Sequence, residues 1–173
     1  MSRFSEATDL ARKTAEMASH DIGIRETGKN SGKRIKQYLA TVGLKQDGHP
    51  YCIAAVCTWI KEAAAAGGVR QELLFSPSCI RFLAYAVKTN HAFLPVELTP
   101  GMLPCVFIID HGKGKGHAGL VIEHPRHRRL AHLGLGGDLG EACRHGETVT
   151  HRQSLARIAA RSSICCKVLL ASR

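Results

Sequence analysis

The sequence has no long hydrophobic run. No stretch approaches the roughly eighteen consecutive apolar residues that a membrane-spanning helix needs, so we expect no membrane span. The first 20 residues are polar and amphipathic and lack the apolar core of a secretory signal peptide. We therefore expect a protein that is made in the cytoplasm without a signal peptide.

The sequence also lacks any Cys-x-x-Cys pair, although it contains 7 cysteines. Zinc sites made of cysteine commonly use such pairs, so we expect no metal site. An odd number of cysteines leaves at least one thiol unpaired. Without a signal peptide, reduced thiols are the expected state.

Acidic residues are few. The chain has 14 Asp and Glu against 24 Lys and Arg, which gives a net charge of +10 and a pI of about 9.6. This balance indicates an anionic partner, which is a nucleic acid, a membrane surface or an acidic wall polymer. Aromatic residues make up only 5% of the chain, and no recognised DNA- or RNA-binding motif is present, so nucleic acid is not the partner we expect.

The pattern of apolar residues divides the chain into two halves. A length of 173 residues suits one domain, residues 1–173, with a substantial core. Helical spacing predicts helices over 5–20, 33–42, 52–68 and 79–88, the last capped by Ser78, with Ile80, Leu83 and Val87 as its core face. After Pro100 short apolar runs predict strands at 105–109, 117–122 and 129–133, and weaker ones at 147–151 and 164–170. Helices followed by antiparallel strands predict the α+β class.

Cys52 stands where a turn ends and a helix begins. Asp47 to Pro50 form the turn, and apolar residues then recur at helical spacing from Ile53 to Ile60. A cysteine in the first turn of a helix faces unpaired backbone N–H groups and the positive end of the helix dipole, which favours the nucleophilic thiolate. The alternative is a buried structural cysteine.

His117 follows a glycine-rich connection, residues 111–116, and begins a predicted strand. Paired with Cys52, a histidine base takes the thiol proton and lowers the cysteine pKa. The alternative is an ordinary solvent-facing histidine at the end of a strand.

Two sequence blocks together resemble a known family. Tyr51-Cys52 opening a helix, and Gly-His-Ala-Gly-Leu-Val at 116–121 after an apolar strand, resemble the CHAP domain (cysteine- and histidine-dependent amidohydrolase/peptidase). Glu-Thr-Gly-Lys-Asn-Ser-Gly at 26–32 is similar to the lead-in of such wall hydrolases, and the resemblance covers residues 24–137. It implies a papain-like fold, with a nucleophile helix packed on an antiparallel sheet, and cofactor-free cleavage of amide bonds in peptidoglycan. It assigns Cys52 as nucleophile and His117 as base, with the Cys52 backbone N–H, and Tyr51 as a second donor, stabilising the oxyanion.

The third catalytic position departs from the family pattern. The family usually places Glu or Asn on the strand after the histidine strand, whereas residues 132–138 read His-Leu-Gly-Leu-Gly-Gly-Asp. His132 is the nearest polar residue, and related NlpC-type peptidases use a histidine third residue. We therefore expect His132 to orient His117, with Asp138, in a glycine loop, as the alternative.

Other features have ordinary explanations. Residues 112–116, Gly-Lys-Gly-Lys-Gly, lack the Walker pattern of a phosphate loop, and we expect a hairpin there. The basic cluster 124–132 is a surface turn or an anion or metal site.

The expected partners are peptidoglycan and anionic wall polymers, reached through phage lysis or non-classical export. The alternatives are an inactive wall-binding module and a basic nucleic-acid-binding protein.

Overall fold

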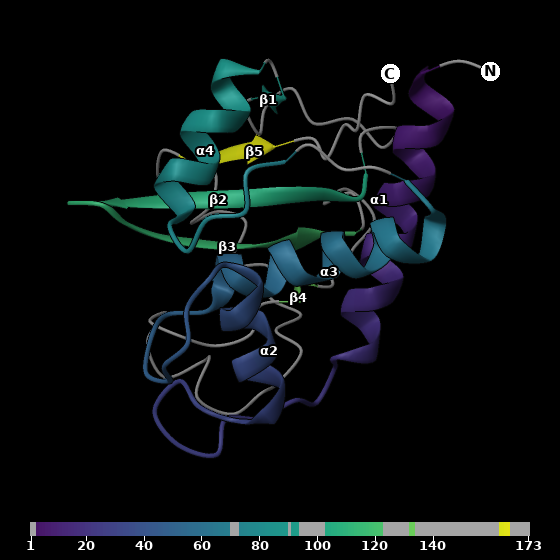
Figure 1. The fold of residues 1–173 in the computed structure, drawn as a ribbon. Helices are drawn as coiled ribbons and strands as arrows, with labels where there is room; N and C mark the ends of the chain where they lie inside the picture. Colours follow the sequence, from purple (N-terminus) through teal and green to yellow (C-terminus); the bar gives the residue numbers. More distant parts are fainter. Residues whose placement is uncertain are drawn as a thin grey trace.

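The computed structural model describes residues 3–69, 73–89, 91–93, 103–122, 132–133 and 163–166, and describes only the backbone of residues 3–8, 93, 132–133 and 163–166. In this part of the chain, four helices precede all of the strands, so the α+β class is confirmed (Figure 1). The helices are α1 (Arg3–His20), α2 (Lys33–Thr41), α3 (Cys52–Gly67) and α4 (Cys79–Lys88). The strands are β1 (Ala92–Phe93), β2 (Cys105–Gly112), β3 (Lys115–Val121), β4 (His132–Leu133) and β5 (Ser163–Cys166).

The strands form one antiparallel sheet in the order β1-β5-β2-β3-β4. Its centre is the hairpin of β2 and β3, which turns at Lys113 and Gly114. Both turn residues have positive φ, 53° and 75°, as a tight two-residue hairpin requires. The glycine-rich stretch is therefore a hairpin, as expected. The expected strands 105–109 and 117–122 were too short at the hairpin, because β2 continues to Gly112 and β3 begins at Lys115. At its other end β3 stops at Val121, one residue earlier than expected.

Helix α3 lies at the centre of the molecule, where it contacts α1, α2 and β3 (Figure 1). Its sequence explains this position. Apolar residues occupy most positions of α3 and lie on all of its faces. A helix with this pattern is stable when other elements of the protein cover it. It is capped by Gly68, which adopts the left-handed conformation with φ of 63°. The Gly68 N–H donates to the Ala65 carbonyl at 3.3 Å, and the Val69 N–H donates to the Ala64 carbonyl at 3.0 Å.

One face of the β2–β3 hairpin completes the main core. Alternate residues of the two strands point toward the helices, and the buried ones on this face are Val106, Ile108, Ala118 and Leu120. They pack with apolar side chains of α2, α3 and α4. Fully burying side chains of this size contributes roughly 1.5–3 kcal/mol each, so this layer fixes α3 and α4 against the sheet.

The core face that we expected for α4 is partly wrong. Leu83 is buried as expected, but Val87 is 53% exposed and Ile80 is only partly buried. The buried residues are Cys79, Phe82, Leu83 and Ala86. The physical reason lies on β3. Gly116 has no side chain, and a Cβ there would come within 3.0 Å of the Cβ of Cys79, so the helix docks with Cys79 facing the strand.

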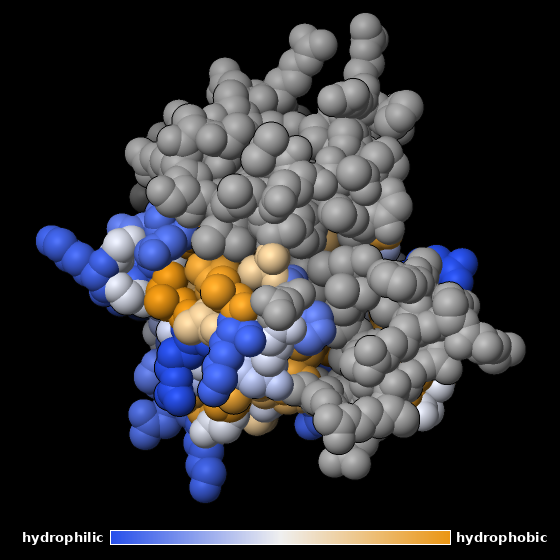
Figure 2. All heavy atoms as spheres, turned by 90° about the horizontal axis from the view of Figure 1, so that it is seen from above, coloured by the Kyte–Doolittle hydropathy of each residue, from blue (hydrophilic) through white to orange (hydrophobic). Residues whose placement is uncertain are grey.

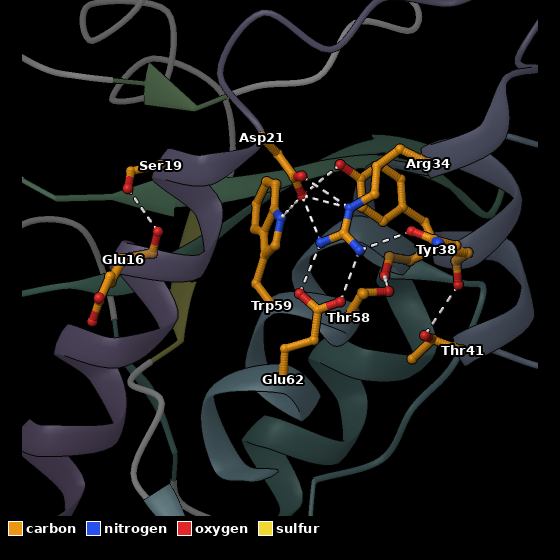
Figure 3. Close-up of polar contacts among 11 residues, drawn as sticks. Glu16, Ser19, Asp21, Arg34, Tyr38, Thr41, Thr58, Trp59 and Glu62 are labelled. Carbon is orange, nitrogen blue, oxygen red and sulfur yellow. Dashed lines mark hydrogen bonds and ion pairs between the residues drawn. The ribbon is translucent and has the colours of Figure 1, made fainter. Parts of the chain in front are cut away.

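A polar network joins Asp21, the residue after α1, to side chains of α2 and α3 (Figure 3). The buried carboxylate of Asp21 accepts hydrogen bonds from Arg34, from the Tyr38 hydroxyl at 2.7 Å and from the Trp59 indole N–H at 2.7 Å. Arg34 also donates to both carboxylate oxygens of Glu62, at 2.8 and 2.7 Å. The network therefore fixes the orientation of α3 relative to the two helices before it.

The later strands are described only in part. Of the expected strand 129–133, residues 132–133 form β4, and of the expected strand 164–170, residues 164–166 belong to β5, which begins one residue earlier. Residues 129–131 and 167–170 lie outside the described residues. The expected strand 147–151, and the basic cluster except for the backbone of His132, lie outside the described residues.

Candidate active site

Two helix starts meet at a pair of cysteines. Cys52 is the first residue of α3, and Cys79 is the first residue of α4. Their Sγ atoms lie 3.7 Å apart, within the range of a hydrogen bond between sulfurs, and both thiols are free. Cys52 is partly exposed and Cys79 is buried. Of the two, Cys52 is therefore the thiol that an external molecule can reach.

The loop before α3 is held by the lead-in segment. The Tyr51 hydroxyl donates to Glu26 Oε1 at 2.8 Å, and the backbone N–H of Asn30 donates to Glu26 Oε2 at 2.9 Å. The Asn30 amide donates to the Gly48 carbonyl at 3.2 Å, and the Gly48 N–H donates back to the Asn30 carbonyl. These bonds fix the turn that delivers the chain to Cys52.

His117 lies on β3 opposite Ile109 and is only 2% exposed. Its ring packs against Phe107, with 5.9 Å between the ring centroids and an angle of 49° between the planes. This contact limits the orientations open to the imidazole.

Cys52 approaches β3 at the residues that flank His117. Its Sγ lies 4.0 Å from the Gly116 carbonyl oxygen, and the His117 side chain and the Ala118 backbone N–H are close enough to lower its pKa. Among the described residues, β4 pairs with β3 only at Leu120 and Val121, so this pairing does not reach the residues that flank His117. The structure thus brings Cys52 and His117 together, although 65 positions separate them in the sequence.

The surroundings of Cys52 favour its ionised form. The hydrogen bond with Cys79 lowers the pKa of Cys52 most, burial opposes this, and the His117 side chain and the Ala118 N–H lower it further. The hydrogen bond with Cys52 raises the pKa of Cys79 most, and burial and the negative charge of the Cys52 thiolate raise it further. Cys57, on the same helix as Cys52, shows the opposite environment, since burial raises its pKa to about 12.

The first turn of α3 adds donors near the sulfur. Among the described residues no side chain caps α3, whereas the Ser78 hydroxyl caps α4 by accepting from the Arg81 N–H at 3.3 Å. The N–H groups of the first turn of α3 have no intrahelical partner. The backbone N–H of Cys52 therefore stays a candidate donor to an oxyanion, as expected. The Tyr51 hydroxyl instead binds Glu26.

The register does not place His132 beside His117. His132 pairs with Val121, four residues further along β3 than His117. At a rise of about 3.3 Å per residue, this offset is about 13 Å along the strand. The side chain of His132, and Asp138 altogether, lie outside the described residues, so the structure does not establish the expected orienting role of His132.

Sequence reasoning missed Cys79 as a member of this cluster. We expected it only as the start of a helix capped by Ser78. The available signal was that both Cys52 and Cys79 open a helix, because two positive helix ends near one thiolate favour it.

Within the described residues, no group of three or more His, Cys, Asp or Glu is arranged to hold a metal ion. None of the described helices is long and apolar enough to cross a membrane.

No protein-family model, curated protein or solved structure matches this chain.

Proposed function

We propose that the protein is a cysteine hydrolase that cleaves amide bonds of peptidoglycan, with Cys52 as nucleophile and His117 as base. The observation that carries the proposal is the closeness of Cys52, at the start of α3, to His117 on β3, in surroundings that lower the pKa of Cys52. A thiolate beside an imidazole is the arrangement that nucleophilic amide cleavage needs.

A papain-like architecture is part of the proposal. It is supported by a helix that begins at the reactive cysteine and packs against an antiparallel sheet that carries the histidine. The choice of peptidoglycan rests on the resemblance of residues 24–137 to CHAP domains and on the net charge of +10, which suits an anionic wall.

The reaction proceeds in two halves. The Cys52 thiolate attacks the amide carbonyl carbon, and the backbone N–H of Cys52 stabilises the oxyanion that forms. The C–N bond breaks as the amine takes a proton from the His117 imidazolium, which leaves a thioester on Cys52. Neutral His117 then removes a proton from water, the water oxygen attacks the thioester, and the C–S bond breaks. This step releases the acid and restores the thiolate and the imidazolium.

Digestion of purified peptidoglycan tests the proposal. The parent protein should release fragments with new amino and carboxyl ends, identified by mass analysis, and Cys52→Ser should release none, because the hydroxyl is a far weaker nucleophile at this site. Cys57→Ala is the matched control, since Cys57 lies on the same helix but is fully buried, and it should retain activity. Fragment release by Cys52→Ser would contradict the proposed mechanism. Binding of the parent protein without any release would favour an inactive wall-binding module.

A further inference from the structure

The Cys52–Cys79 contact is more than two side chains that happen to be close. Cys79 is held from three sides. Ser78 caps its helix, the Ser78 N–H donates to the buried Ser76 hydroxyl at 3.2 Å, and the Cys79 Cβ packs so closely on Gly116 that a Cβ at that glycine would lie only 3.0 Å from it. Cys79 is therefore fixed with its sulfur 3.7 Å from that of Cys52.

The two thiols have unequal surroundings. Cys52 has the His117 side chain and the Ala118 N–H as further partners, and it is the more exposed of the pair. One negative charge on the pair therefore resides on Cys52, and a second is opposed by repulsion between like charges. Cys79 then keeps its proton and has an adjacent acceptor for it.

We propose that Cys79 is a positioning residue whose S–H donates a hydrogen bond to the Cys52 thiolate and thereby holds the nucleophile ionised. The inference rests on Cys52 being the nucleophile of the proposed function. Among the described residues, the titratable groups that face Cys52 are Cys79 from α4 and His117 from β3. The hydroxyl of Tyr51, the residue before Cys52, is bonded to Glu26.

The test measures how the rate of Cys52 alkylation by iodoacetamide depends on pH, with site-resolved mass spectrometry, and needs no wall substrate. In Cys79→Ala the midpoint should move upward by about one pH unit or more, toward the ordinary thiol value of about 8.5, because the donor to the thiolate is gone. Cys79→Ser should keep the midpoint near that of the parent, because its hydroxyl is also a donor.

The pair of variants separates a donor from a packing effect. Ala and Ser are both smaller than Cys, so a purely structural role would give both variants the same shift. Cys79→Val, which fills the space without a donor, should follow Cys79→Ala and serves if the Ala variant fails to fold. Cys57→Ala should leave the midpoint of Cys52 unchanged.

An unchanged midpoint in Cys79→Ala and Cys79→Val, or an equal shift in Cys79→Ser, would overturn the inference. The proposed function can fail separately. A parent protein that releases no peptidoglycan fragments, yet shows the donor-dependent midpoint, would retain the Cys79 interaction and lose only the proposed reaction.

Discussion

Three cysteines show how surroundings set the chemistry of one residue type. Cys52 and Cys57 share α3, yet the pKa of Cys52 is lowered by its polar partners whereas burial raises that of Cys57 to about 12. Cys79 shares a helix-start position with Cys52 but is buried. The sequence predicts the helix starts, because turn and capping residues are local signals. Which thiols touch depends on packing between distant elements.

His132 offers a prediction at the level of a single residue. Because the register sets it four residues from His117 along β3, we expect His132→Ala to retain peptidoglycan turnover close to that of the parent. The measurement is kcat and KM on a soluble wall peptide. A loss of kcat by orders of magnitude with unchanged KM would instead establish His132 as the residue that orients His117.

The closeness of Cys52 to His117 could be predicted from the sequence, whereas the register of the strand that carries His132 could not, for a physical reason. A turn before Cys52 and a strand around His117 are local patterns, and the resemblance to CHAP domains joined them. Pairing between β3 and β4 depends on the length of the intervening connection, and each residue of register shift moves a side chain by about 3.3 Å and to the other face. Identity at position 132 alone does not fix that register.

At the scale of whole elements, the pattern of apolar and polar residues predicted where the helices lie in the sequence better than it predicted which face of α4 is buried. Gly68 sets the C-terminal end of α3, and Ser78 sets the start of α4; both are local signals in the sequence. The face of α4 was missed because Ile80 and Val87 suit a core by hydrophobicity, whereas the contact actually made depends on the space at Gly116. A missing side chain on one element selects the face of another.

The polar network of Asp21 predicts how much the placement of α3 depends on one carboxylate. Asp21→Ala leaves donors of Arg34, Tyr38 and Trp59 without their acceptor. Breaking a buried ion pair costs about 3–5 kcal/mol. Because Arg34 keeps its pair with Glu62, we expect the free energy of unfolding to fall by about 3 kcal/mol. Thermal unfolding followed by circular dichroism should show a fall in Tm of roughly 6–12 °C.

Asp9→Ala is the matched control for that network. Asp9 pairs with Arg12 on the surface of α1, where both side chains are more than half exposed, so its loss should cost about 0.5 kcal/mol or less. Equal destabilisation by Asp9→Ala and Asp21→Ala would show that the Asp21 network contributes no more than a surface ion pair.

On the scale of the whole molecule, we expect the net charge to govern binding of the protein to the wall and Cys52 to govern cleavage of the wall. The net charge of +10 acts over the surface, and hydrophilic side chains extend outward around a smaller group of hydrophobic ones on the described part of one face (Figure 2). Cys52, in contrast, acts only on a molecule that reaches its partly exposed sulfur at the start of α3. Binding to the wall and hydrolysis of the wall should therefore respond to different changes.

This separation gives a prediction for binding to isolated walls. Binding should weaken as NaCl is raised from about 0.05 to 0.5 M, because salt shortens the Debye length from more than 10 Å to a few ångströms and screens attraction to anionic polymers. Cosedimentation with walls measures this, and Cys52→Ala is the form to use, since it should bind without degrading the wall. Walls stripped of their anionic polymers should bind less at low salt. Binding that does not change with salt would mean that contacts other than charge recruit the protein to the wall.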